Sequence, residues 1–292
     1  KTGYQNMEIQ YDYALGMPLK HKLMPQYLSE LGYETHGFGK WNIGHCNEKY
    51  MPHMRGFNHF LGYFCPGHGY RDYICGLEAG VKDMYEGFND EVSGQTWGTG
   101  EKYQGTYDTE LYRDYSSRVI RKHAKTFGNS TNHKPLFMWV AHHAAHGTYD
   151  SEPNPPDSLM TDENQKYIAV LKKREDEASE SGESKFFGKR LITATLIMSV
   201  DNALKDLVGA LEETALMNNT LLLVNSDNGG DPNYAVGHPG NNFPLRSEKF
   251  YYFEGATRVP AFIFAPGMIP SALQGTTFSG MMHHVDLLPT FV

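Results

Sequence analysis

The feature that most constrains the fold is an alternation of short apolar runs with longer amphipathic stretches. Apolar runs cover residues 135–141, 220–226 and 258–265. Stretches with apolar residues at helical spacing cover residues 20–31, 107–127 and 188–216. This alternation is typical of a sheet whose strands are joined by crossover helices. The chain is therefore predicted to be an α/β protein with a mostly parallel central sheet and helices on both faces.

Two glycines mark expected helix ends, and two segments are expected to be strands of the sheet. Gly32 follows the first amphipathic stretch and Gly128 follows the second, as is common just after a helix C-terminus. A short strand over 33–39 then runs into Lys40. The run 135–141 is a compact apolar segment, which predicts a central strand of the sheet.

Residues 150–186 differ in composition from the rest of the chain. They are rich in Asp, Glu, Ser, Lys and Pro and poor in large apolar side chains. Such a composition favours an exposed, partly mobile insertion, with a contact site for another chain as the alternative. No internal repeat or low-complexity linker divides the sequence. Residues 1–292 are therefore predicted to form a single domain that carries this insertion.

The charge and the apolar pattern argue against two classes of partner. The formal net charge is −8 and the sequence has no long basic run, which argues against a surface that binds nucleic acid. No stretch approaches about 18 consecutive apolar residues, so no membrane-spanning helix is expected.

Three cysteines and two glycosylation sequons bear on the compartment. Cys65 and Cys75 flank a loop rich in Gly, Pro and Tyr and could close a short disulfide. Cys46 would then be left for a partner outside this chain. The sequence holds no C-x-x-C pair, so a cysteine metal site is not expected. Asn129 and Asn218 each begin a sequon at an expected loop, which is typical of a secreted glycoprotein.

Polar residues follow the strand expected over 220–226. Asp227 and Asn228 come directly after it and are followed by two glycines. A carboxylate beside a carboxamide offers the hard oxygen ligands that Ca²⁺ or Mg²⁺ prefers. Ligands of open α/β sheets bind at the carboxyl ends of the strands, which is where this pair stands. A plain turn is the alternative reading of Asp-Asn-Gly-Gly.

Histidines and a lysine follow two other expected strands. His142, His143 and His146 come after 135–141, and such a cluster can bind metal or transfer protons. The alternative is that single histidines hydrogen-bond loop carbonyls. Lys40, at the end of its strand, could bind an anion such as sulfate or phosphate, whereas a lone lysine is usually solvated surface.

A further group of cations lies in 241–258, where Arg246, Lys249 and Arg258 stand among aromatic residues. In isolation this segment could be an ordinary amphipathic surface. Its position after the Asp-Asn-Gly-Gly motif adds positive charge to the groups expected near the ends of the strands.

The order of these motifs resembles that of the sulfatase family, and is most similar to the arylsulfatase B and arylsulfatase I/J branch. The likeness rests on G-Y-x-T…G-K-W at residues 32–41, S-D-N-G-G at 226–230, G-N-N-x-P-L-R-x-x-K…E-G-x-x-R at 240–258 and H-x-D-x-L-P-T at 284–290. It covers essentially the whole chain. The resemblance implies a sulfatase/alkaline-phosphatase-like α/β fold that is incomplete at both ends of this chain.

The resemblance also implies a mechanism. Family members convert a Cys or Ser in a C/S-x-P-S-R motif into formylglycine, whose hydrate attacks the sulfur of a sulfate ester oriented by Ca²⁺. Asp227 and Asn228 match two of the metal ligands, and Lys40 and Lys249 match two lysines that contact the sulfate. His146 matches the histidine that protonates the leaving alcohol. Fixed positive charge and a general acid suit the release of an alkoxide from a sulfate ester.

The chain departs from the family pattern in two ways. No C/S-x-P-S-R motif occurs in it, and two early aspartates of the metal site have no match. The formylglycine and the rest of the fold are therefore expected before Lys1 and after Val292. Asn42 stands where the family usually has His, and Asn cannot carry a proton at neutral pH. This substitution predicts reduced or lost activity.

Three functions fit these observations. The first is a secreted or lysosomal sulfatase that uses Ca²⁺ and acts on sulfated small molecules or glycans. The second is a catalytically inactive sulfatase-like protein with a binding or structural role in an extracellular assembly. Asn42 favours the second function, whereas the retained lysines, histidine and metal ligands favour the first. The third is a phosphatase or phosphodiesterase of the same superfamily, whose typical His/Asp metal sets are not evident in the sequence.

Overall fold

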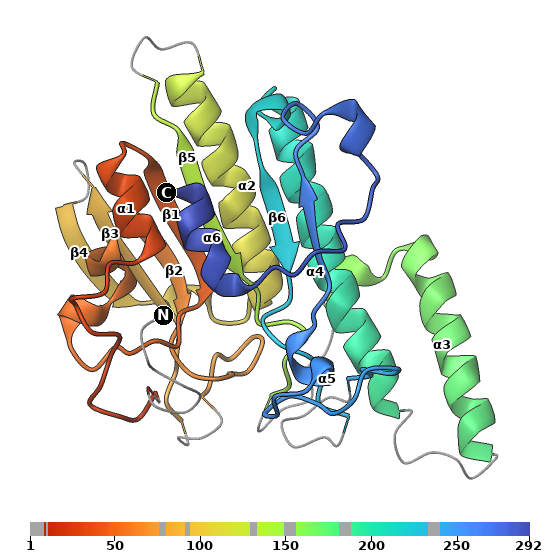
Figure 1. The fold of residues 1–292 in the computed structure, drawn as a ribbon. Coiled ribbons are helices and arrows are strands. Elements are labelled where there is room, and N and C mark those ends of the chain that lie inside the picture. The colour runs from red at the N-terminus through yellow and green to blue at the C-terminus, as the bar shows by residue number, and fades with distance from the viewer. Residues whose placement is uncertain are drawn as a thin grey trace.

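The computed structural model describes residues 9, 11–75, 80–90, 94–128, 133–148, 156–180, 188–232 and 240–292. They form a five-stranded sheet, a separate two-stranded sheet and the helices packed around them (Figure 1). The strands are β1 (Glu34–Lys40), β2 (His59–Tyr63), β3 (Tyr85–Asp90), β4 (Gly94–Thr99), β5 (Leu136–Ala141), β6 (Leu222–Asn225) and β7 (Ala261–Phe264). The α-helices are α1 (Met24–Glu30), α2 (Asp108–Phe127), α3 (Asp162–Glu180), α4 (Gly188–Glu213), α5 (Glu254–Thr257) and α6 (His284–Phe291).

The larger sheet has the strand order β4-β3-β2-β1-β5. β1 lies between β2 and β5 and is parallel to both, whereas β3 and β4 run antiparallel to their neighbours. The register aligns Lys40 with Tyr63 and Gly39 with Ala141, so three parallel strands end at the same edge of the sheet. The sheet is therefore mixed, where the sequence pattern predicts a mostly parallel one.

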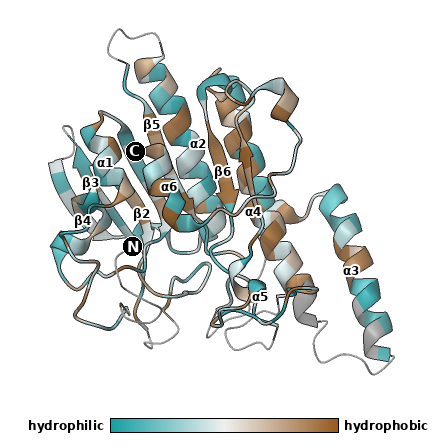
Figure 2. Ribbon diagram, in the orientation of Figure 1, coloured by the Kyte–Doolittle hydropathy of each residue, from teal (hydrophilic) through white to brown (hydrophobic). Residues whose placement is uncertain are grey.

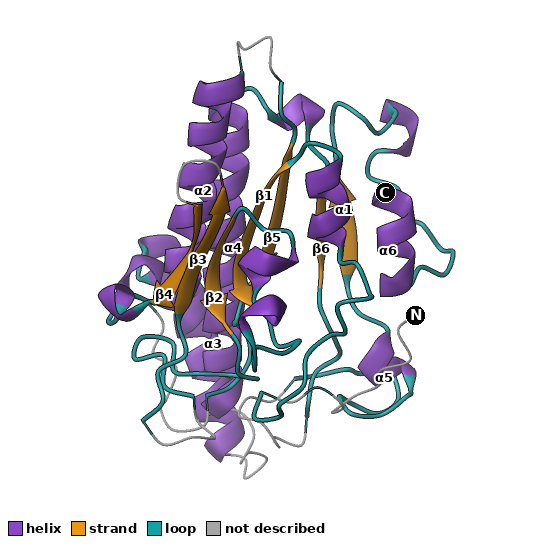
Figure 3. Cartoon of the chain, turned by 90° about the vertical axis from the view of Figure 1, so that its left-hand side faces the viewer, coloured by secondary structure: helices purple, strands orange, loops and turns teal. Residues whose placement is uncertain are grey.

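Helices cover both faces of this sheet, as the sequence predicts. α2 contacts β1 and β5 on one face and packs against α4, and α1 contacts β1 on the opposite face (Figure 3). The helices end next to the glycines that were expected to follow them. α1 stops just before Gly32, whose φ of +87° is in the left-handed region, and α2 ends at Phe127 before Gly128. Asp108 and Glu110 lie in the first turn of α2, where negative charge is favoured by the helix dipole.

The prediction of a central strand at 135–141 is wrong for the described chain. β5 is the last strand of the five-stranded sheet, and its Trp139 is 48% exposed. An apolar run indicates that both faces of a strand are buried. It does not indicate whether the strand is hydrogen-bonded to a neighbour along both of its edges. The runs 220–226 and 258–265 do form strands, but β6 and β7 pair antiparallel with each other in a separate sheet.

The core lies mainly between the sheet and α2. Phe38, Leu61, Tyr63 and Tyr112 are fully buried there, and a second cluster around Ile120 joins α2 to α4. Figure 2 shows that β6 and much of α4 are hydrophobic as well. No helix among the described residues is both long enough and apolar enough to cross a bilayer.

The charged segment 150–186 contains α3, which contacts α4. Most of the described residues of α3 are exposed. Charged and polar side chains can therefore remain solvated along this helix, in keeping with the composition that distinguishes the segment.

The junction of β1 and β5 provides a test of the packing. Gly39 has a φ of +93°, and an added Cβ would lie 1.9 Å from the carbonyl oxygen of Ala141. Gly39→Ala is expected to lower the free energy of unfolding by about 3 kcal/mol or more, because a backbone clash adds to the left-handed strain of about 1–2 kcal/mol. Urea denaturation of the full-length protein measures the loss.

Gly32→Ala is the matched control for this substitution. Gly32 has a similar φ of +87°, and an added Cβ would meet nothing within 4 Å. Its loss is expected to be only the strain of about 1–2 kcal/mol. Equal losses for the two variants would show that the approach of β1 to β5 does not constrain the fold.

Candidate functional site

The parallel strands bring several polar groups to one edge of the sheet. Lys40 is the last residue of β1, and His143 and His146 follow the end of β5. Tyr63 ends β2 and is followed by the loop that contains His68. Because β1 is parallel to both neighbours, these groups come from adjacent strand ends, as the sequence predicts for Lys40 and the histidines.

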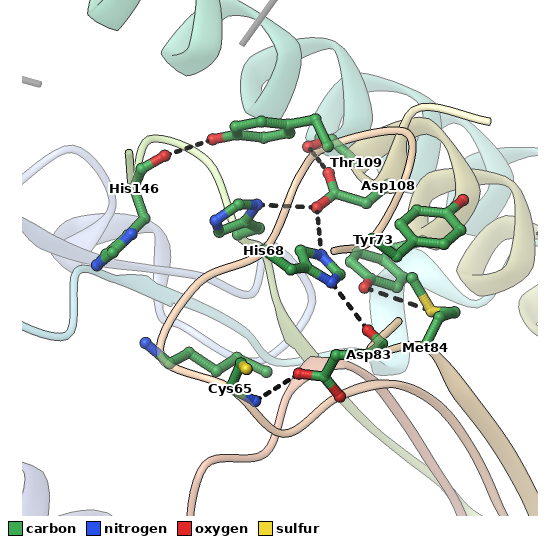
Figure 4. Close-up of polar contacts among 12 residues, drawn as sticks. Cys65, His68, Tyr73, Asp83, Met84, Asp108, Thr109 and His146 are labelled. Carbon is green, nitrogen blue, oxygen red and sulfur yellow. Dashed lines mark hydrogen bonds and ion pairs between the residues drawn. The ribbon is translucent and has the colours of Figure 1, made fainter. Parts of the chain in front are cut away.

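The loop after β2 is held in place by a disulfide and a buried carboxylate. Cys65 and Cys75 are joined, with Cα atoms 6.2 Å apart. Asp83 accepts hydrogen bonds from the backbone N–H groups of Phe64, at 3.0 Å, and Cys65, at 2.6 Å (Figure 4). Burial raises the pKa of Asp83, and these hydrogen bonds favour its ionised form. The loop therefore has a fixed starting point at the end of β2.

This loop touches both Lys40 and His146. The Lys40 ammonium donates a hydrogen bond of 2.7 Å to the carbonyl oxygen of Pro66. The Tyr70 hydroxyl donates to the carbonyl oxygen of His146 at 2.8 Å (Figure 4). A Cβ on Gly67 would lie 3.0 Å from Nδ1 of His146, so the backbone of the loop packs directly on this imidazole.

The Asp-Asn-Gly-Gly loop is hydrogen-bonded to the segment that carries Lys249. Asn242 accepts a hydrogen bond from the N–H of Gly230 at 2.8 Å and donates to its carbonyl oxygen at 2.9 Å. The backbone N–H of Lys249 donates to the same carbonyl at 3.0 Å. These contacts fix Lys249 beside the loop that begins with Asp227.

The charges of these residues act on one another. The pKa of Lys40 is lowered from its ordinary 10.5 to about 8, first by burial and then by the charge of Lys249, while Asp227 opposes the shift. The pKa of His146 is lowered to about 3 by burial and by His143, Lys40 and Lys249. Lys40, His146 and Lys249, here called the lysine–histidine cluster, therefore act on one another electrostatically, and the charges of the two lysines suit an anion.

Asp227 and Asn228 have the chemistry of a site for a hard cation. The Asn228 side-chain N–H group donates to the carbonyl oxygen of Gly229 at 2.8 Å, which leaves the amide oxygen available as a ligand. The Asp227 carboxylate is exposed. Both offer oxygen atoms, and Ca²⁺ takes about six to eight of them. This pair fits part of a Ca²⁺ coordination shell.

Asn42 lies two residues beyond β1 in a constrained backbone conformation. Its φ is +46°, in the left-handed region that Asn, Asp and His enter more readily than other residues with a Cβ. Neighbouring Trp41 donates from its indole N–H to the carbonyl oxygens of Gly44 and Tyr50. The turn after Lys40 is thus stabilised by contacts that do not involve the Asn42 side chain.

Among the other expected residues, Cys46, Asn218 and Arg246 are described by the structure and Asn129 is not. Cys46 is exposed and is not in a disulfide within the described residues. Asn218 is exposed in a short 3-10 helix, where a glycan could be attached. Asn129 lies outside the described residues. Arg246 stacks on the ring of Phe253, with its guanidinium carbon 3.9 Å from the ring centroid.

Two buried polar residues were missed by reasoning from the sequence. The first is His68, in the loop after β2, and the second is Asp108, the first residue of α2. Asp108 contacts both His68 and His143. His68 lies 40 residues before Asp108, and Asp108 lies 35 residues before His143. No local sequence pattern predicts that these residues meet. The one signal in the sequence is the Gly/Pro/Tyr-rich composition of the loop that contains His68.

Comparison with known proteins defines the family. The family model described as "Sulfatase" matches residues 2–292, and the chain belongs to the sulfatase family. Arylsulfatase J of Mus musculus is 29% identical over 294 residues, which is 100% of this chain and 42% of that protein. Human N-acetylgalactosamine-6-sulfatase is 25% identical, over 87% of this chain and 41% of its own length. The chain thus spans less than half the length of these relatives.

Solved structures agree in fold. The crystal structure of Ps i-CgsB in complex with k-i-k-neocarrahexaose matches 97% of this chain and 55% of its own, with a TM-score of 0.70 and 23% identity. The structure of BT4656 in complex with its substrate D-glucosamine-2-N,6-O-disulfate matches 96% of this chain and 62% of its own, with a TM-score of 0.52 and 18% identity. The fold is therefore the α/β fold of the sulfatases.

The low pKa of Lys40 gives a direct test of the lysine–histidine cluster. Folding lowers this pKa, so protonated Lys40 costs stability below about pH 8, and the cost fades as pH rises from 8 to 10.5. In the full-length protein with ¹³C-dimethylated lysines, NMR should show one resonance that titrates near pH 8 and is lost in Lys40→Arg. Added sulfate should raise that pKa, because an anion favours the charged amine.

Lys249→Met is the informative companion variant. Removing the neighbouring cation is expected to raise the pKa of Lys40 and to weaken the response to sulfate. A Lys40 titration that ignores both sulfate and the loss of Lys249 would show that the two lysines do not share an anion site.

Proposed function

We propose that the full-length protein is a sulfatase that hydrolyses sulfate esters. The observation that carries the proposal is the convergence of Lys40, His146, Lys249 and Asp227 in a chain of the sulfatase family. A sulfate ester is an anion, and two neighbouring lysines beside a histidine provide the positive charge and hydrogen-bond donors that such a group needs to bind.

The residues of this chain have distinct roles in the proposed reaction. Lys40 and Lys249 bind the sulfate oxygens and stabilise negative charge that grows in the transition state. His146 donates from Nδ1 to the carbonyl oxygen of Gly147 at 2.8 Å, so Nε2 is the atom left to protonate the leaving oxygen. Anion binding beside both lysines offsets their charge and thereby favours the protonated form of His146.

Asp227 and Asn228 are the residues that would hold Ca²⁺, which supplies positive charge at the sulfate oxygens. The 292 residues contain no C/S-x-P-S-R motif. The nucleophile in this proposal is a formylglycine that the full-length protein supplies from outside them. Catalysis is therefore proposed for the full-length protein and not for residues 1–292 in isolation.

The proposed substrates are sulfated glycans or smaller sulfate esters, in a secreted or lysosomal setting. Relatives are named for sulfate on N-acetylgalactosamine and N-acetylglucosamine, and one solved relative holds a neocarrahexaose. The Cys65–Cys75 disulfide and the exposed sequon at Asn218 are typical of proteins outside the cytosol. The charged insertion is proposed to remain solvated, with contact to other chains as the alternative.

Removal of single cluster residues tests the proposal. In the full-length protein, Lys249→Ala is expected to lower kcat/KM for an aryl sulfate about 10²–10³-fold, because one stabiliser of the transition-state charge is lost. His146→Ala should lower kcat about 10²–10⁴-fold, with a smaller effect on an ester whose leaving group is more acidic. Mass spectrometry should first establish that formylglycine is present.

Lys173→Ala is the control, because Lys173 is 78% exposed on α3 and pairs with Glu177 on the same helix. It should leave the rate unchanged. Wild-type rates in both Lys249→Ala and His146→Ala would refute the assignment of the lysine–histidine cluster as the active site.

An inactive sulfatase-like protein with a binding or structural role is the second candidate, and Asn42 is the observation that favours it. Asn42→His would restore a group that can carry a proton at a backbone position that His also tolerates. If Asn42 limits activity, this variant should raise kcat about 10²-fold or more, within the range for a single acid–base group. No gain, with formylglycine present, would remove Asn42 as the limiting residue.

A further inference from the structure

Three residues from separate parts of the chain meet in the interior behind the lysine–histidine cluster. Nε2 of His68 lies 3.2 Å from Oδ2 of Asp108, and Nδ1 of His143 lies 3.0 Å from the same oxygen (Figure 4). The side chains of all three are fully buried. His68, Asp108 and His143, here called the buried triad, come from the loop after β2, the start of α2 and the segment after β5.

The orientation of His68 is fixed by its other nitrogen. Nδ1 lies 2.9 Å from the backbone carbonyl oxygen of Asp83, and a carbonyl can only accept, so Nδ1 carries the hydrogen. In a neutral imidazole this leaves a lone pair on Nε2, which faces the carboxylate of Asp108 at 3.2 Å. Two electron-rich atoms at this separation require a proton or a cation between them.

The Asp108 carboxylate also requires a proton or a cation beside it. Its ion pairs within the described residues are both to histidines, and its other oxygen accepts a hydrogen bond from the Thr109 hydroxyl at 3.0 Å. A fully buried carboxylate is costly unless positive charge lies beside it. No arginine or lysine of the described chain pairs with it, so the compensating charge must be a proton on a histidine or a bound metal ion.

Two further polar atoms beside the triad lack a hydrogen-bond partner among the described residues. They are Nε2 of His143 and the hydroxyl of Tyr63, and both are buried. The Tyr63 ring stacks on His68, with centroids 4.1 Å apart, and lies edge-on to His143 at 5.5 Å. An unpartnered hydroxyl in a native interior calls for an explanation, and for Tyr63 an ion with its remaining ligands is one.

We infer that the buried triad is a binding site for a divalent transition-metal ion of the Zn²⁺ type. Two imidazole nitrogens and one carboxylate are a usual protein ligand set for Zn²⁺. Bonds of about 2.0–2.1 Å in tetrahedral geometry place neighbouring ligand atoms about 3.3 Å apart, close to the separations of 3.0 and 3.2 Å. The contact of His68 with the Asp83 carbonyl is the outer-shell hydrogen bond that ligating histidines usually make.

This site is separate from the pair Asp227 and Asn228. The triad offers nitrogen donors and is fully buried, whereas the pair offers only oxygen donors and Asp227 is exposed. The ion would join the loop after β2 to α2 and to the segment that leads to His146. The inference does not rest on sulfatase activity, so either proposal can fail without the other.

Metal content measures the site directly. The full-length protein is purified, exposed to Zn²⁺, freed of excess ion, and unfolded in guanidinium with a chelating dye that counts the released metal. The wild type is expected to release about one Zn²⁺ more per chain than Asp108→Asn or His68→Gln. Glu177→Gln is the matched control, since it also removes one carboxylate charge, from an exposed position on α3, and it should release as much as the wild type.

Cobalt provides a readout that does not depend on any variant folding. Wild-type protein loaded with Co²⁺ should show the visible d–d bands of a four- or five-coordinate nitrogen and oxygen site, and Zn²⁺ should displace them. Circular dichroism establishes which variants are folded. Wild-type protein that takes up neither ion would overturn the inference and leave a proton as the compensating charge. So would folded Asp108→Asn and His68→Gln proteins that release as much Zn²⁺ as the wild type.

Discussion

The parallel pairing of β1 with both β2 and β5 is the constraint on which the site depends. It places Lys40, Tyr63 and the segment after Ala141 at one edge of the sheet. The backbones approach so closely at this end that a Cβ on Gly39 or on Gly62 would lie 1.9 Å from a carbonyl oxygen of the adjacent strand. The spacing of the site is therefore set by contact between main chains, before any side chain of the lysine–histidine cluster is placed.

Hydrogen bonds and ring contacts of buried polar groups fix the loops that follow the strand ends. Asp83 holds the first residues after β2, and Asp108 brings His68 and His143 together at the start of α2. Tyr70 is stacked on His143 with centroids 4.3 Å apart and donates to the carbonyl oxygen of His146. Each of these groups would be costly without its partner, so the interior tolerates few alternative arrangements of the loops.

Local patterns explain which parts could be predicted from the sequence. Helical spacing ended by glycine located α1 and α2, and polar motifs after apolar runs located Lys40, His146 and Asp227 near the ends of strands. These features could be predicted because each depends only on residues that are close together in the sequence. β2, β3 and β4 were not anticipated, and a Gly-rich, polar segment such as 94–99 carries no apolar alternation. The edge position of β5 was also missed, since edge pairing depends on segments elsewhere in the chain.

The buried triad shows the same limit at the level of the site. His68 and Asp108 lie 40 residues apart, and each taken alone would read as a loop histidine or as an acidic residue at a helix start. Their meeting depends on the register of β2 with β1 and on where the loop after β2 returns to α2. Such convergence is a property of the tertiary fold, and only the structure reveals it.

Asn42 has a backbone conformation that both Asn and His can adopt. A φ of +46° explains why this position accepts Asn as readily as His, so the change of residue need not disturb the turn after Lys40. Lys40 is placed by the end of β1, and Lys249 by the carbonyl oxygen of Gly230. Neither position depends on residue 42. Lys40 and Lys249, which are proposed to bind the sulfate group, are therefore held by main-chain contacts that do not involve the Asn42 side chain. A change at residue 42 is thus expected to affect the proposed hydrolysis more than the proposed binding.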